Sequence, residues 1–301
     1  MTAYLQARYT YQMETLKTMF RDYIKQVITL AKSSTHITGE NVYQEGAGDI
    51  LPYLDKMVEA LILPGSGIDG LENLEELFTK AGEGKSCLLF PEHYSNLDLS
   101  LFSYLVRKAG GRGEDIAKSL VAIAGMKLNE ENPVVAAFAS AYTRLVIYPS
   151  RSLHGLEPER KKAELIRSSA INRAAMKALT DLKTKGRLVL IFPSGTRYRP
   201  WDPSTKQGVR EIDSYIKSFD YMCCVAINGE VLHVRQGDMM DDAVSQDVVR
   251  LSAGPVMSCA EFRSKARAEE TADKKQLVAD AIMAELEKMH IEGEERRKRF
   301  L

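Results

Sequence analysis

A histidine and an aspartate with four residues between them are the first residues in the chain that suggest chemistry. His93 and Asp98 lie where a short apolar run, residues 86–90, gives way to a helical pattern. Histidine is the side chain most readily used as a general base near neutral pH, and a carboxylate on its second ring nitrogen fixes its tautomer and orientation. On a regular helix an offset of five residues separates two side chains by about 140°. We therefore expect His93 in the loop and Asp98 in the first helical turn.

The same residues also have a purely structural interpretation. Ser95 is followed three residues later by Asp98 and then by an apolar run, which is the pattern of a capping box at a helix N-terminus. A capping box explains Asp98 without any catalysis. This stretch alone does not decide between the two interpretations.

Two more predicted strand ends carry polar residues that suit an anion. The residues concerned are Arg144, Ser150 and Arg151 around the apolar run 145–148, and Ser194, Gly195, Thr196, Arg197 and Arg199 after the run 188–192. Ligands bind at the carboxyl ends of parallel strands, so we expect these groups to converge with His93. The planar guanidinium of arginine matches phosphate oxygens. Gly195, with its two small neighbours, can form a nest of N–H groups for an anion.

The elements that must position these residues follow from the hydrophobic pattern. Helical spacing of apolar residues predicts helices over 4–32, 49–63 and 71–81. From residue 84 onward, apolar runs alternate with helical ones. The expected strands are 86–90, 119–124, 145–148, 188–192 and 222–227, and the expected helices are 97–109, 133–142, 157–183 and 209–218. Buried strands that alternate with helices predict a mostly parallel α/β sheet flanked by helices.

Two domains are expected, a smaller N-terminal helical subdomain (1–82) and an α/β domain (83–301). Residues 229–256 are expected to add strands, and residues 261–292 to form a closing helix. The basic end, residues 296–300, is interpreted as a solvated tail, with attraction to a membrane surface as the alternative.

Composition limits the possible partners and compartments. The 301 residues are 45% hydrophobic and 27% charged, with 41 basic and 41 acidic side chains. This balance gives no overall field for nucleic acid. No run approaches the roughly 18 to 20 apolar residues that span a bilayer, and the first thirty residues lack the pattern of a signal peptide. The four cysteines show no metal-binding spacing, so we expect core thiols in a reducing compartment and a cytoplasmic protein, soluble or peripheral to a membrane.

Two blocks of the sequence resemble those of the glycerolipid acyltransferase superfamily. Residues 93–98 match its H-x-x-x-x-D block, and residues 192–197 look like its phenylalanine-proline-glutamate-glycine-threonine block. Ser194 in place of the glutamate, with Arg197 and Arg199 following, is closest to the soluble plastid-type glycerol-3-phosphate acyltransferases. The resemblance covers roughly residues 84–230.

The resemblance implies a role for each matched residue. His93 would take the proton from a glycerol hydroxyl, with Asp98 as its orienter, and Arg197 and Arg199 would bind the phosphate. Arg151 falls near a basic pair of the family, although Ser150 stands where one basic residue is expected. An Arg197→Ala change is then expected mainly to raise the KM for the phosphate substrate.

These features together predict a glycerol-3-phosphate 1-O-acyltransferase that uses an acyl thioester of acyl carrier protein or coenzyme A. No cofactor, metal or nucleic acid is expected. The chain has no G-x-S-x-G or P-loop motif for a hydrolase or an NTPase. The alternatives are an acyltransferase that uses lysophosphatidate as acceptor, against which Ser194 argues, and a non-catalytic phospholipid-binding protein.

The other histidines receive different interpretations. His36 and His290 are expected at the surface, and His233 in a strand. His154 is a candidate for the phosphate site, because it follows Arg151 on the same loop.

Overall fold

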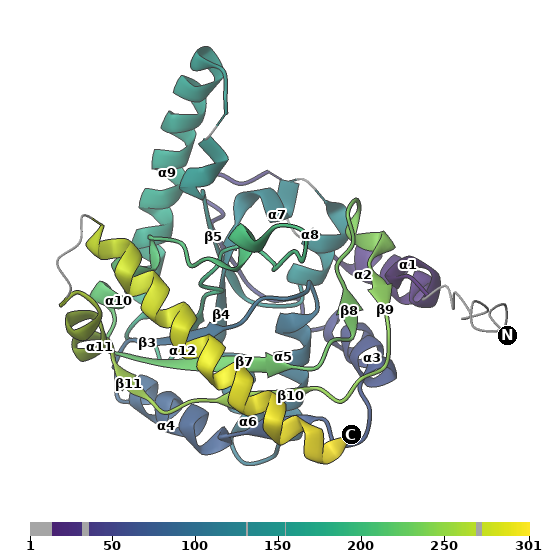
Figure 1. Cartoon of the computed structure of the whole chain (residues 1–301). Helices are drawn as coiled ribbons and strands as arrows, with labels where there is room; N and C mark the ends of the chain where they lie inside the picture. The colour runs from purple at the N-terminus through teal and green to yellow at the C-terminus, as the bar shows by residue number, and fades with distance from the viewer. Residues whose placement is uncertain (1–13, 32–35, 131, 154, 269–272) are drawn as a thin grey trace, which may run out of the picture.

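The computed structural model describes residues 14–31, 36–130, 132–153, 155–268 and 273–301 (Figure 1). The helices are α1 (Leu16–Met19), α2 (Arg21–Leu30), α3 (Leu51–Leu61), α4 (Leu71–Gly82), α5 (Asp98–Lys108), α6 (Gly113–Ser119), α7 (Met126–Glu130), α8 (Pro133–Ala139), α9 (Pro158–Leu182), α10 (Ile212–Ser218), α11 (Cys259–Ala266) and α12 (Lys274–Arg297). The strands are β1 (Tyr43–Gln44), β2 (Gly67–Asp69), β3 (Cys87–Pro91), β4 (Leu120–Gly125), β5 (Arg144–Ile147), β6 (Leu188–Leu190), β7 (Tyr221–Asn228), β8 (Leu232–His233), β9 (Ala243–Val244), β10 (Arg250–Ala253) and β11 (Met257–Ser258). Short 3₁₀ turns are η1 (Ser150–Leu153), η2 (Pro203–Lys206), η3 (Met239–Asp241) and η4 (Lys298–Phe300).

One mixed sheet organises the described part of the chain. Its order is β1-β5-β4-β6-β3-β7-β10-β2, with β11 paired to β7. The five central strands, β5, β4, β6, β3 and β7, are parallel to one another. They are the five strands predicted from the apolar runs, and the predicted α/β class is confirmed. The carboxyl ends of β3, β5 and β6, which precede the candidate site residues, therefore lie at one edge of the sheet.

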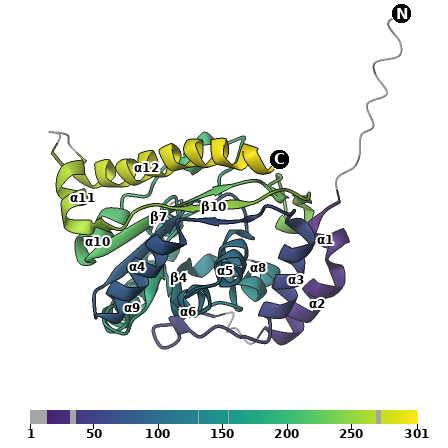
Figure 2. The ribbon, with the colours of Figure 1, turned by 90° about the horizontal axis from the view of Figure 1, so that it is seen from below.

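Both faces of the sheet are buried, because successive strand residues point to opposite sides. Leu89 joins a core cluster with α3, α4 and α5, whereas Leu88 and Phe90 join a second cluster with α9, α10 and α12. Figure 2 shows α12 along one face of β7 and β10, with α5, α6 and α8 beyond the other face. The near-continuous apolar composition of these strands follows from burial on both sides.

The N-terminal segment joins the same sheet. β1 pairs with β5 and β2 pairs with β10, so the sheet runs across the predicted boundary at residue 82. The predicted long helix over 4–32 is interrupted at Phe20, between α1 and α2; residues 4–13 and 32 lie outside the described residues.

Two predictions at the C-terminal end are wrong in part. The closing helix is not continuous from residue 261, because α11 ends at Ala266 and α12 begins at Lys274. The basic end is a solvated tail only from Lys298 onward, where its residues are exposed. Arg297 donates to Asp247 at 3.1 Å and Arg296 donates to Ser252 at 3.0 Å, so the last turns of α12 are fastened to the loop before β10 and to β10 itself.

Candidate active site

His93 and Asp98 form the pair that their spacing predicts. His93 follows β3 in the loop, and Asp98 is the first residue of α5. The His93 Nδ1 atom lies 2.9 Å from Asp98 Oδ2, and the Asp98 side chain is only 3% exposed. When Asp98 is ionised, Nδ1 carries the ring proton, and Nε2 is left as the proton acceptor.

Asp98 also folds the loop that carries His93. Its Oδ2 atom accepts hydrogen bonds from the backbone N–H of Tyr94 at 2.6 Å and of Ser95 at 2.8 Å, and its Oδ1 atom accepts from Ser95 Oγ at 2.6 Å. Leu97, rather than Ser95, is the N-cap of α5, and it makes no side-chain cap. The catalytic and structural interpretations of Asp98 are therefore not exclusive, since one carboxylate orients the imidazole and holds the loop.

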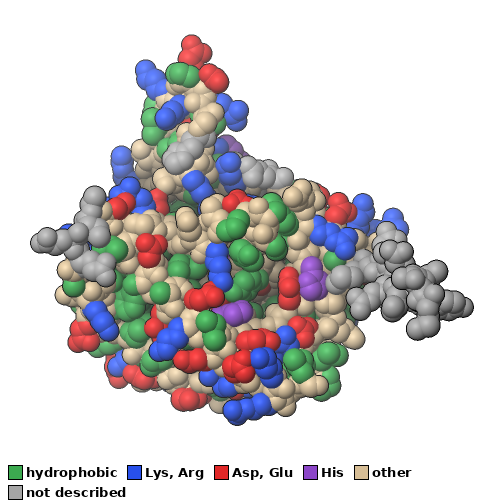
Figure 3. All heavy atoms as spheres, in the orientation of Figure 1, with side chains coloured by type: hydrophobic (Ala, Val, Ile, Leu, Met, Phe, Trp, Pro, Cys, Tyr) green, Lys and Arg blue, Asp and Glu red, His purple; other side chains and the backbone are tan. Residues whose placement is uncertain are grey.

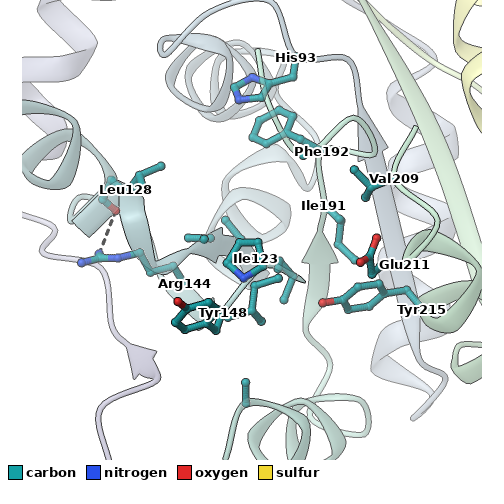
Figure 4. A pocket seen from close by; sticks show the side chains of 18 of the residues that line it. His93, Ile123, Leu128, Arg144, Tyr148, Ile191, Phe192, Val209, Glu211 and Tyr215 are labelled. Carbon is teal, nitrogen blue, oxygen red and sulfur yellow. Dashed lines mark hydrogen bonds between the residues drawn. The ribbon is translucent and has the colours of Figure 1, made fainter. Parts of the chain in front are cut away.

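A second loop packs against His93 from about a hundred residues later in the sequence. The ring of Phe192 stacks on the imidazole with 3.9 Å between centroids, as Figure 4 shows. The backbone N–H of Tyr198 donates to the His93 carbonyl at 2.8 Å. The imidazole is thus fixed by Asp98 on one side and by the loop after β6 on the other.

His93 lines a cavity of about 570 Å³. Gly195 after β6 and Arg151 after β5 line the same cavity, so the three strand ends converge as predicted. The rest of the wall is mainly apolar and includes Ile123, Leu128, Val135, Phe138, Ile147, Ala175, Met176, Ile191, Val209 and Ile212. Figure 3 shows hydrophobic side chains lining a hollow below the projecting half of α9. The cavity therefore joins a proton acceptor and a cation to a large apolar space.

Arg151 in the cavity wall and the nearby Arg199 are a pair of close cations. Arg151 Nη2 donates to the Gly195 carbonyl, and a side chain at Gly195, whose φ is +62°, would place its Cβ 3.4 Å from Arg151 Nη1. Burial lowers the pKa of Arg151, and the nearby charge of Arg199 lowers it further. Within the described residues neither arginine forms an ion pair with a carboxylate. Glu211, which lines the same cavity, acts in the opposite direction and raises the pKa of Arg151.

Arg197 forms an ion pair with the buried side chain of Asp242. Its Nη1 atom lies 2.9 Å from Oδ2 of Asp242, whose side chain is 1% exposed. Burial raises the pKa of Asp242, and Arg197 opposes that rise. Arg197 and Arg199 are not among the described residues that line the cavity. Of the two arginines predicted to bind phosphate, only Arg199 is close to Arg151.

Polar groups of the turn after β6 form hydrogen bonds with one another. Ser194 Oγ donates to the Thr196 carbonyl at 2.6 Å, and the N–H of Gly195 donates to the Phe192 carbonyl at 2.9 Å. The Gly195 N–H is therefore committed to this turn and is not free for an anion, so the predicted nest lacks that donor. Ser194 is buried and shapes the turn.

Three residues close to the site were missed from the sequence. Glu92 and Tyr94 flank His93, and both contact His290 on α12. The prediction that His290 is a surface residue is only partly right, because its side chain is 29% exposed and its Nδ1 atom lies 2.9 Å from Glu92 Oε2. An acidic residue between an apolar strand and His93 was the available signal, since a buried carboxylate needs a partner.

The other histidines and Arg144 lie in different parts of the fold. His36 is exposed and His233 lies in β8, as predicted, whereas His154 is outside the described residues. Arg144 is 2% exposed, and burial lowers its pKa to about 10. Its Nη1 atom donates to the Ala139 carbonyl at 3.0 Å, so this residue supports the end of α8.

Comparison with known proteins agrees with this site. The model of the Acyltransferase family matches residues 67–240. This is more than half of the chain and includes His93, Asp98, Arg151 and the loop after β6, so the chain belongs to the Acyltransferase family.

Other comparisons are more distant. No curated protein sequence matches the chain. A crystal structure of the 1-acyl-sn-glycerophosphate (LPA) acyltransferase PlsC from Thermotoga maritima is similar with a TM-score of 0.43 and 16% identity over 79% of each chain. Among the described helices, none combines the length and apolar character needed to cross a bilayer.

Proposed function

We propose that this acyltransferase is a glycerol-3-phosphate 1-O-acyltransferase, which transfers a fatty acyl group from a thioester of acyl carrier protein or coenzyme A to the sn-1 hydroxyl. The observation that carries the proposal is the shared cavity. One cavity has the His93 imidazole and the Arg151 guanidinium in a wall that is otherwise mainly apolar. A phosphorylated alcohol and an acyl chain are the two substrates that such a wall accommodates.

The reaction follows from the orientation of the imidazole. His93 Nε2 takes the proton of the acceptor hydroxyl while its oxygen attacks the thioester carbonyl carbon. The tetrahedral intermediate then collapses, the carbon–sulfur bond breaks, and the imidazolium returns the proton to the departing thiolate. Asp98 stabilises the imidazolium and keeps Nδ1 protonated. No protein nucleophile is required.

Arg151 and Arg199 support a phosphorylated acceptor. Their charges repel one another and Glu211 offsets that repulsion only in part, since the pKa of Arg151 stays lowered; a phosphate would relieve it further while accepting bidentate hydrogen bonds. Arg197 can join them only by leaving Asp242.

The direct test measures thiol release with each combination of substrates. Acyl-CoA and acyl carrier protein donors are each combined with glycerol 3-phosphate and with lysophosphatidate. We expect release with glycerol 3-phosphate and loss of at least about 10²-fold in kcat for His93→Ala, the range that a positioned base supplies. Release with lysophosphatidate alone would identify the second acyltransferase reaction. Binding of either lipid without turnover, or an undiminished His93→Ala variant, would reject the proposal.

A further inference from the structure

The buried side chain of Glu92 links the loop of His93 to the C-terminal helix. Glu92 is 5% exposed, directly after β3 and directly before His93. Its Oε2 atom accepts from the N–H of Ile227 at 2.8 Å and lies 2.9 Å from His290 Nδ1. Its Oε1 atom accepts from the Tyr94 hydroxyl at 2.8 Å. The carboxylate is thus fixed by a strand, by the catalytic loop and by α12.

Tyr94 continues this link to the catalytic pair. Its hydroxyl binds Glu92, and its backbone N–H donates to the same Asp98 oxygen that holds the His93 imidazole. The rings of Tyr94 and His290 lie 5.5 Å apart. Glu92 and Tyr94, which flank His93 in the sequence, therefore both contact His290 through their side chains.

The same face of α12 reaches the second loop of the site. Glu287, three residues before His290, forms an ion pair with Lys206 in η2. Gln276 Nε2 donates to the Gly208 carbonyl at 3.0 Å. Figure 1 shows α12 crossing in front of β7. α12 begins 34 residues after the last residue matched by the family model.

We propose that His290 is a positioning residue for the acyl transfer, because it fixes Glu92 and Tyr94 and through them the loop that presents His93 and Asp98. This inference depends on the proposed function only because that function determines which substrates are used in the kinetic test. It assigns a role at the active site to a helix that lies outside the matched family region.

The competing explanation is that His290 merely attaches α12 to the sheet. The chain offers a matched control for this, since Arg297 also fastens α12, through Asp247 at 3.1 Å, and contacts neither loop of the site. A second control is His290→Asn, because the Asn Nδ2 occupies the place of the His Nδ1 on the same carbon and can donate to Glu92.

The test compares His290→Ala, His290→Asn and Arg297→Ala with the unaltered chain, below their unfolding midpoints. We expect His290→Ala to lower kcat roughly ten- to a hundredfold with little change in KM, as small misplacements of a reacting group do. His290→Asn should recover most of the loss, and Arg297→Ala should lower the unfolding midpoint but not kcat. Unchanged kcat in His290→Ala, an effect on KM alone, or an equal loss in Arg297→Ala would overturn the proposal.

A second readout does not require turnover. The ring Cε1–H resonance of His93, assigned by its absence in His93→Ala, should shift in His290→Ala and remain near its original position in His290→Asn and Arg297→Ala. An unmoved resonance in His290→Ala would overturn the positioning role. If no acceptor is acylated by the unaltered chain, the proposed function fails while this comparison still decides the role of His290.

Discussion

Asp98 shows how much a single residue of this site does. Its two oxygens accept three hydrogen bonds from Tyr94 and Ser95, in addition to the contact with His93. A carboxylate that accepts several hydrogen bonds is held in one orientation. The residue that the sequence left open between catalysis and helix capping serves the loop and the imidazole together.

The two arginines Arg151 and Arg197 should respond differently to the same change. Arg151→Gln removes a cation from the cavity wall, so we expect a raised KM for glycerol 3-phosphate with little loss of stability. Arg197→Gln leaves Asp242 buried without its partner, so we expect the free energy of unfolding to fall by about 3 kcal/mol. Steady-state kinetics and urea unfolding of both variants separate the two effects.

The control for this pair is Arg197→Gln combined with Asp242→Asn. The double variant should regain stability, because no charge is left buried alone. If Arg197→Gln instead leaves stability unchanged and raises the KM as much as Arg151→Gln does, Arg197 binds the phosphate and its ion pair with Asp242 is replaced when substrate binds.

Sequence patterns predicted the local pair and missed the distant ones. His93 and Asp98 were identified because their spacing of five residues places them together at a strand-to-helix junction. Asp242 is 45 residues from Arg197 and His290 is 198 residues from Glu92. No periodicity relates such positions, so the sequence indicates neither contact.

At the scale of elements, burial decided which predictions succeeded. The five central strands were predicted because burial on both faces makes them continuous apolar runs. β1 and β2 were missed because they are edge strands of two and three residues that are only partly buried. The breaks at Phe20 and after Ala266 were missed because apolar residues keep helical spacing on both sides of them.

The contact between α12 and the loop of His93 should make stability depend on pH. The hydrogen bond to Glu92 raises the pKa of His290 above its usual 6.5. The resulting stabilisation is complete below about pH 6.5 and is lost as the pH rises through the raised pKa. The other charged or titratable groups facing His290 are Tyr94, Lys206 of η2 and Glu287 of α12.

Thermal unfolding of the unaltered chain and of His290→Ala between pH 5 and 9 measures this contribution. We expect the difference between their unfolding midpoints to be largest at the acidic end and to shrink toward pH 9. A difference that grows with pH would show that the imidazole is neutral throughout and that Glu92 does not raise its pKa.

At the scale of the whole molecule, the cavity beside His93 is lined by residues from both faces of the sheet. Ala122 and Ile123 are neighbours in β4 with side chains on opposite faces, and both line it. The cavity therefore passes over the carboxyl end of the central strands beside His93. Such a path gives a long apolar substrate room on either side of the sheet.

Narrowing this cavity should change the preferred acyl chain. Ala124→Leu adds three carbons to the wall at the end of β4, so we expect kcat/KM for a long-chain donor to fall at least about tenfold relative to a short-chain donor. Donors of increasing length, assayed with the unaltered chain and the variant, measure the ratio. Ala163→Leu, at an exposed position of α9, is the matched control. An unchanged ratio in Ala124→Leu would mean that the acyl chain lies elsewhere.

The sequence separation of 198 positions from Glu92 to His290 also sets an interval during protein synthesis. At a translation rate of about 5 to 20 residues per second, the catalytic loop emerges some 10 to 40 seconds before its histidine partner. Throughout that interval the nascent chain holds an acidic side chain whose final partner has not yet been made. Water solvates this carboxylate until then, so the buried position of Glu92 against α12 can form only after α12 has been synthesised.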